Sequence, residues 1–189
     1  MKEKYFLITA LFCLTIGAYG QYNKDFRLNF GLQWNLPERY FNNDLSKFNG
    51  QNSGVGLHLY PKWFYNQNLS LGLNVEYAMV QEQATTDNIG VFHIFSFSPT
   101  ANYSFTQSKV RPYIGLGIGL YTVSLADKKL SAGIRPLIGI SLFERFDLSF
   151  EYSKIFGDLE INPDVSKGFG NYYVSLKGSY SIKFSMTKK

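Results

Sequence analysis

Large apolar residues recur at almost every second position along three long segments, and this period of two constrains the fold more than any other feature. The intervening positions carry polar or small residues, and the segments span Phe26–Leu36, Leu69–Met79 and Val174–Phe184. Side chains at i and i+2 share one face of a β-strand, whereas a helix repeats every 3.6 residues. The three segments are therefore predicted to be strands with one apolar and one polar face.

Five further segments follow the alternation less regularly and bring the predicted total to eight strands. They are Val55–Phe64, Val91–Phe105, Pro112–Thr122, Ala132–Leu142 and Leu148–Phe156. Strands of soluble proteins are usually about 5–6 residues long. A strand of about 11 residues, rising ~3.3 Å per residue and tilted ~40°, covers roughly the apolar band of an outer membrane. Length and even number predict an all-β fold, a transmembrane up-and-down antiparallel β-barrel of eight strands.

The connections between these segments alternate in length. The short ones are Tyr65–Asn68, Thr106–Arg111 and Phe143–Asp147, and the long ones are Pro37–Ser53, Val80–Gly90, Val123–Ser131 and Gly157–Asn171. Outer-membrane barrels have short periplasmic turns and longer external loops. The order of short and long connections therefore predicts that both chain termini lie in the periplasm.

The N-terminal segment has the order of a secretory signal peptide. Lys2 and Lys4 precede an apolar run over Tyr5–Ile16, and small residues follow, so cleavage is predicted after Gly20. A membrane-anchoring helix is the alternative, but the run is shorter than the ~20 residues that span a bilayer. The prediction is export by the Sec route, with residues 1–20 removed and residues 21–189 forming one barrel domain. The single cysteine, Cys13, lies in the segment removed, so the mature chain has no thiol.

A soluble eight-stranded barrel or sandwich, with the apolar face turned inward, is the main alternative fold. Its exterior would be the polar face, which here is mostly Gly, Ser and Asn with few charges and suits a narrow, filled lumen better. The aromatic residues also fall at two depths, as in the girdles of membrane barrels. One predicted girdle is Phe26, Trp63, Tyr65, Tyr103, Phe105 and Phe184, and the other is Trp34, Tyr77, Tyr152 and Tyr172.

Three stretches resemble the recurrent strands of small, OmpX/OmpW-like outer-membrane barrel proteins of the porin type. They are RPYIGLGIGLY (Arg111–Tyr121), GIRPLIGISL (Gly133–Leu142) and LSFEYSKI (Leu148–Ile155). The resemblance implies the outer membrane of a Gram-negative bacterium, with lipids, lipopolysaccharide and the barrel-assembly machinery as partners. Barrels of this family usually end on an aromatic residue, and here Phe184 is followed by Ser-Met-Thr-Lys-Lys.

Lys62 and five further charged or titratable residues lie on the predicted inward face, and those five make up the candidate lumen network. They are His58, Glu76, Arg135, Glu151 and Lys177. Charges in a narrow lumen need partners, because an unpaired buried charge is costly. We expect a polar network that plugs the lumen, with His58 level with Glu76 and Glu151 near Lys177. A gated polar path is the alternative, although eight strands leave an interior just wide enough for side chains.

No residue pattern predicts a metal site or a cofactor, and no pattern identifies a protein partner. The net charge is +5, but its basic residues are scattered, so nucleic-acid binding is not expected. The sequence favours a structural or surface-interaction barrel without catalysis over one that passes small or apolar solutes. A lipid A-modifying enzyme is a third hypothesis. One deacylase family places His and Ser two apart on one strand, whereas here Tyr60 follows His58 and Phe95 follows His93.

Overall fold

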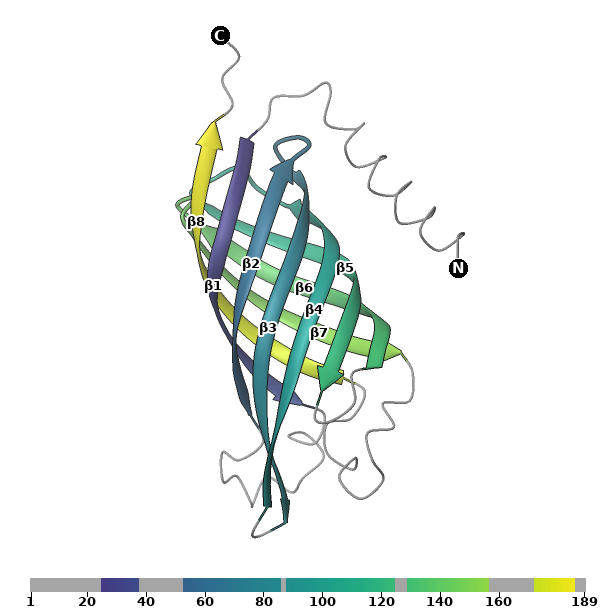
Figure 1. Ribbon diagram of the computed structural model, residues 1–189. Helices are drawn as coiled ribbons and strands as arrows, with labels where there is room; N and C mark the ends of the chain where they lie inside the picture. The colour runs from purple at the N-terminus through teal and green to yellow at the C-terminus, as the bar shows by residue number, and fades with distance from the viewer. Residues whose placement is uncertain (1–24, 38–52, 86–87, 125–128, 157–171, 186–189) are drawn as a thin grey trace, which may run out of the picture.

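The computed structural model describes residues 25–37, 53–85, 88–124, 129–156 and 172–185, and these residues form one closed barrel (Figure 1). Each strand pairs antiparallel with the next, and β1 closes the barrel against β8. The eight-stranded, up-and-down prediction is confirmed. The strands are β1 (Asp25–Pro37), β2 (Gly54–Phe64), β3 (Leu69–Thr85), β4 (Asn88–Ser104), β5 (Val110–Ser124), β6 (Lys129–Leu142), β7 (Phe146–Phe156) and β8 (Tyr172–Ser185).

The apolar face of the sheet points outward, which rejects the soluble alternative. Leu32, Leu57 and Ile118 are 60–68% exposed, whereas Asn35 and Arg135 are fully buried in the lumen. A water-soluble barrel would have the opposite arrangement, because exposure of so much apolar surface to water is unfavourable. Among the described residues, there is no apolar helix long enough to span a membrane.

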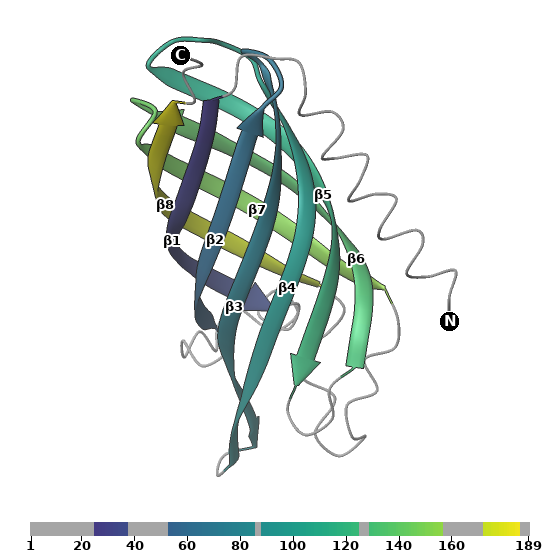
Figure 2. The same cartoon turned by 45° about the horizontal axis from the view of Figure 1, so that its top comes forward.

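The hairpin of β3 and β4 is longer than the sequence predicts. Both strands have 17 residues, and their pairing continues to Gln83 and Ile89, with a register shift before Thr85. The predicted loop Val80–Gly90 is therefore wrong. The hairpin extends beyond the other strands at the end of the barrel away from the termini (Figures 1 and 2). Our reading of the alternation failed because the inward side chains at this end, such as Val80 and Phe92, are apolar.

The start of the first strand and the end of the last strand lie at the same rim of the barrel. Asp25 at the start of β1 pairs with Ser185 at the end of β8. The turns after β2, β4 and β6 lie at this rim too, since neighbouring strands are antiparallel (Figure 1). The predicted signal peptide, the whole loop Gly157–Asn171 and the central parts of the loops Pro37–Ser53 and Val123–Ser131 lie outside the described residues.

An apolar cluster occupies the lumen toward the rim opposite the termini. Its members, from β3, β4, β5, β7 and β8, are at most 1% exposed; they are Ala78, Val80, Phe92, Ile94, Tyr121, Val123, Ile155 and Tyr173. Buried polar side chains such as Asn35 and Ser175 lie at this end of the lumen as well, so apolar and polar residues share it. The lumen is therefore a packed interior at this end.

Candidate functional sites on the two faces of the barrel wall

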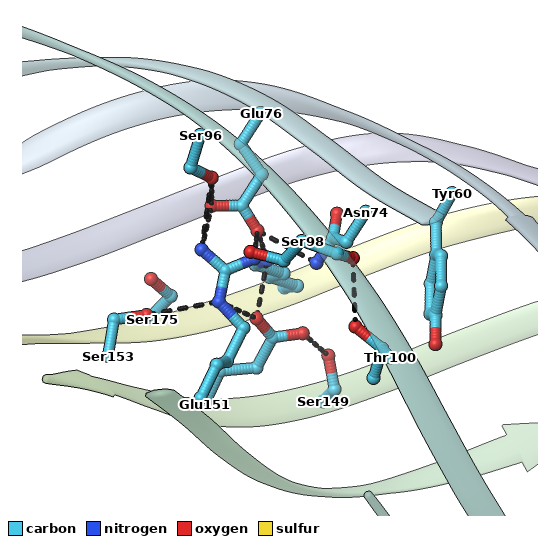
Figure 3. Close-up of polar contacts among 12 residues, drawn as sticks. Tyr60, Asn74, Glu76, Ser96, Ser98, Thr100, Ser149, Glu151, Ser153 and Ser175 are labelled. Carbon is cyan, nitrogen blue, oxygen red and sulfur yellow. Dashed lines mark hydrogen bonds and ion pairs between the residues drawn. The ribbon is translucent and has the colours of Figure 1, made fainter. Parts of the chain in front are cut away.

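A charge network from four strands fills the middle of the lumen. Arg135 of β6 donates to both carboxylate oxygens of Glu76 on β3, with Nη1–Oε1 at 2.6 Å and Nη2–Oε2 at 2.8 Å. Ser96 of β4 donates to Glu76 Oε2 at 3.0 Å (Figure 3). This fork-to-carboxylate geometry is the strongest arrangement for such a pair, and it ties together strands that are not neighbours in the sheet.

The second carboxylate of the network belongs to Glu151 of β7. Lys177 of β8 contacts Glu76 Oε1 and lies 2.6 Å from Glu151 Oε2 through its Nζ. Arg135 Nε is 3.6 Å from the same Glu151 oxygen and donates to Ser153 Oγ at 3.1 Å. Two cations and two carboxylates share one buried volume, so the network is close to neutral. Such neutrality lowers the cost of burying charge.

His58 lies beside this network without joining its ion pairs. It is the register partner of Glu76, so the two residues are level across β2 and β3 as the sequence suggested. Glu76 is instead bonded to Arg135 and Lys177. The Nδ1 atom of His58 is buried and has no hydrogen-bond partner among the described residues. The five predicted lumen residues are thus brought into one region, and four of them form ion pairs.

A second polar group lies nearer the termini, and sequence reasoning placed its Lys62 on the inward face but missed its Asp147. Asp147 accepts a hydrogen bond from Lys62 Nζ at 3.0 Å and another from the Asn29 side chain. Lys62 Nζ also lies 4.7 Å from the ring centre of Tyr60. We had assigned Asp147 to a turn, yet it is spaced by two residues from Ser149, which is itself spaced by two from Glu151 on β7. This spacing places the three side chains on one face of the strand and was the signal that identifies Asp147 as inward-facing.

On the outer wall, His93 of β4 contacts Tyr77 of β3. The Tyr77 hydroxyl is 2.8 Å from His93 Nδ1, and the two rings stack with centroids 6.0 Å apart. Both side chains are exposed on the apolar face. In the sheet, His93 is the register partner of Met79 on β3 and of Ser124 on β5. The chain has two histidines, and this is the one on the outer surface.

The register pair of His93 and Ser124 was overlooked because the sequence was searched for a His and a Ser on one strand. A register partner on the neighbouring strand lies as close as a residue two positions away, but it is identified only once the strands are paired. His93 and Ser124 are 31 positions apart in the chain and become partners through the β4–β5 pairing. Within the described ranges, no group of three or more His, Cys, Asp or Glu residues could hold a metal ion.

A family model described as lipid A 3-O-deacylase (PagL) matches residues 14–157. No curated protein matches the chain. Among solved structures, Neisserial surface protein A is similar, with a TM-score of 0.53 and 19% identity over 86% of this chain and 98% of that one. OprG of Pseudomonas aeruginosa has a TM-score of 0.52 and 14% sequence identity, and the match covers 86% of this chain and 98% of that one. The outer-membrane enzyme PagL has a TM-score of 0.49 and 16% sequence identity, and the match covers 84% of this chain and 98% of that one.

These comparisons confirm a small outer-membrane barrel and place it in the Gram-negative outer membrane. The two structures with the higher TM-scores support the fold alone, because their sequences are distant. The expectation of a barrel without catalysis is wrong, since the family that matches most of the chain is described by an enzymatic activity. The absence of His and Ser two apart on one strand misled that expectation.

Proposed function

Because the chain belongs to the lipid A 3-O-deacylase (PagL) family, we propose that it is an outer-membrane hydrolase that cleaves an acyl ester of lipid A at the outer wall of the barrel. The observation that carries the proposal is the position of His93. This histidine is exposed on the membrane-facing wall and its ring is held by Tyr77. Ester hydrolysis at neutral pH is accelerated by a general base, and histidine is the commonest side chain in that role.

The chemistry belongs on the outer wall because the lumen is filled. The Glu76–Arg135 network and the apolar cluster above it are packed side chains, each almost fully buried. An ester of a membrane lipid reaches the side chains that face the bilayer. The same packing argues against passage of solutes as the function.

The orientation of the barrel would bring His93 toward the leaflet that contains lipid A. We place both termini in the periplasm, because the three short turns share their rim and the two longest connections, residues 38–53 and 157–171, join strands at the opposite rim. His93 lies in the half of β4 nearer Asn88, at the start of that strand, away from the termini. The outer half of the wall is then the half that carries the Tyr77–His93 pair.

The proposed reaction uses His93 as general base and a water molecule as nucleophile. In the required tautomer, His93 Nδ1–H donates to the Tyr77 hydroxyl, so Nε2 accepts a proton of the attacking water. The water oxygen forms a bond to the ester carbonyl carbon, the bond from that carbon to the sugar oxygen breaks, and the sugar oxygen takes the proton from Nε2. The products are a fatty acid and a free sugar hydroxyl.

The test is the mass of lipid A extracted from a Gram-negative host that expresses the protein. Expression of the wild type is expected to lower the mass of lipid A by that of one acyl chain. His93→Gln is expected to lower the rate of this conversion by roughly 10²–10⁴-fold. Val55→Ala is the matched control, because Val55 is an exposed residue on the same wall. Heat-modifiable migration on gels checks that each variant folds.

Wild-type conversion by His93→Gln would overturn the proposal. Tyr77→Phe is expected to change the pH dependence of the rate, because it removes the group that fixes the ring of His93.

A further inference from the structure

On the described part of the strands, one charged side chain faces outward, and it belongs to Lys154 of β7. The other Lys, Arg, Asp and Glu side chains described on the strands lie on the inward face. The register partners of Lys154 are apolar or aromatic, Ile134 on β6 and Tyr172 on β8. A charge on the membrane-facing wall of a barrel is most costly at the bilayer centre and costs little near the interfaces. The depth of Lys154 in the wall therefore determines what its charge contacts.

Lys154 lies close to the rim opposite the termini. It precedes the last residue of β7, Phe156, by two positions, and its partner Tyr172 is the first residue of β8. With both termini placed in the periplasm, this rim is the external one. Tyr152 and Tyr172 lie beside Lys154 on the same face, with their ring centroids 5.3 Å apart. Tyrosine rings favour the headgroup level of a membrane, so Lys154 lies at that level in the outer leaflet.

The ammonium group of Lys154 lies near an aromatic face. Its Nζ is 5.8 Å from the ring centre of Tyr172, within the range of a cation–π contact. The side chain is partly exposed, as expected of a lysine whose apolar stem lies along the wall and whose charged end reaches the interface. Lys154 forms no ion pair with a described carboxylate. An ammonium has three N–H donors, so it can bind an anion of the membrane while it keeps the contact with Tyr172.

We propose that Lys154, together with Tyr152 and Tyr172, binds a phosphate group of a lipid A molecule other than the one hydrolysed at His93. The outer leaflet contains lipid A, whose sugar headgroup carries phosphates at the level of the tyrosine rings, and a lysine binds phosphate as a point charge. β7 is three strands away from β4 in the closed order, so this site and His93 face different directions. The inference rests on the orientation of the barrel and is independent of the hydrolase proposal.

The experiment compares binding of lipid A with two phosphates and of dephosphorylated lipid A to the full-length protein, by native mass spectrometry from mixed micelles. The ratio of the two affinities is the phosphate preference. Every sample carries His93→Gln, and the same spectrum gives the mass of the bound lipid, so any hydrolysis is seen separately. Lys154→Gln is expected to lower the phosphate preference roughly fivefold, the change for one lysine at an anionic membrane surface. Lys154→Arg keeps the charge and should keep the preference.

Lys109→Gln is the control for net charge, because Lys109 is an exposed lysine in the turn between β4 and β5 at the opposite rim. It is expected to leave the phosphate preference unchanged, and heat-modifiable migration checks that each variant folds. Three results would overturn the inference: an unchanged preference in Lys154→Gln, an equal loss in Lys109→Gln, or equal competition by phosphatidylglycerol, which would make the site one for any anionic lipid. A fivefold loss confined to Lys154→Gln would support it, whether or not His93→Gln abolishes hydrolysis.

Discussion

Arg135 of β6 and Glu76 of β3 face each other across the lumen as a two-bond ion pair, although 59 residues separate them in the chain. Neither side chain is more than 1% exposed. The pair joins opposite sides of the barrel, so it determines which inward side chains can pack around it. Lys177 and Glu151 complete a cluster in which each charge has an opposite neighbour.

Glu76→Gln is expected to destabilise the barrel by about 3–5 kcal/mol, because it leaves Arg135 and Lys177 with one carboxylate. Unfolding in urea, followed by heat-modifiable migration, measures the change. Ser98→Ala is the control, because this buried hydroxyl has no hydrogen-bond partner among the described residues. Planar-bilayer conductance is expected to stay near zero in Glu76→Gln, and discrete openings would show that the cluster is a gate instead of a plug.

Arginine scanning is expected to distinguish the two faces of β5. Leu116 is 55% exposed on the outward face, so Leu116→Arg near the bilayer centre should cost about 2–4 kcal/mol. Gly117 faces inward, and a Cβ there would already approach Thr100 Oγ1 at 2.8 Å, so Gly117→Arg should block folding by steric conflict. Leu116→Ala separates loss of the leucine from introduction of charge. Equal tolerance of arginine at both positions would contradict the assigned faces.

The side chains that share one face of a strand could be predicted from the sequence, because the alternation along a strand is a local property. Alternation within a segment identifies which side chains share a face, and this placed Glu76 and Arg135 in the lumen correctly. Their pairing could not be predicted, since it depends on which non-neighbouring strands face each other across a closed barrel. Asp147 was missed for a local reason, because it follows a turn closely enough to be taken for part of it.

The outer site escaped prediction for the same physical reason as the ion pairs. His93 and Tyr77 lie on two strands, and only the register of β3 with β4 makes them neighbours.

The residue types in the turn between β6 and β7 do not suit its backbone conformation, so we expect the turn to be strained. Phe143 and Glu144 have φ angles of 53° and 60°, and Arg145 N–H donates to Leu142 O at 3.0 Å. Two consecutive positive φ values are typical of a type I′ turn, where asparagine and glycine are preferred. Phe143→Asn is therefore expected to raise the free energy of unfolding by about 0.5–1 kcal/mol. Phe143→Ala keeps the unfavourable φ and should give no such gain, and equal stabilisation by both would indicate removal of the exposed ring as the cause.

The pH dependence of stability is expected to include a contribution from Glu144 in the same turn. Burial opposes ionisation of Glu144, but the positive charges of Arg27, Arg111 and Lys183 outweigh it and lower the pKa of this carboxyl group. The contacts are 3.2 Å from Arg27, 2.5 Å from Arg111 and 3.5 Å from Lys183. A lowered folded-state pKa means that the unfolded chain binds the proton more readily, so the stabilisation is present above the unfolded pKa.

That stabilisation should be lost as the pH falls through the folded-state pKa of Glu144. The measurement compares urea unfolding of the wild type and Glu144→Gln from neutral pH to below pH ~4, the ordinary range of a glutamate. The wild type should be the more stable at neutral pH, and the difference should shrink on acidification and with added salt, because the site is partly exposed. A difference that stays constant across this range would show that Glu144 stabilises the turn without its charge.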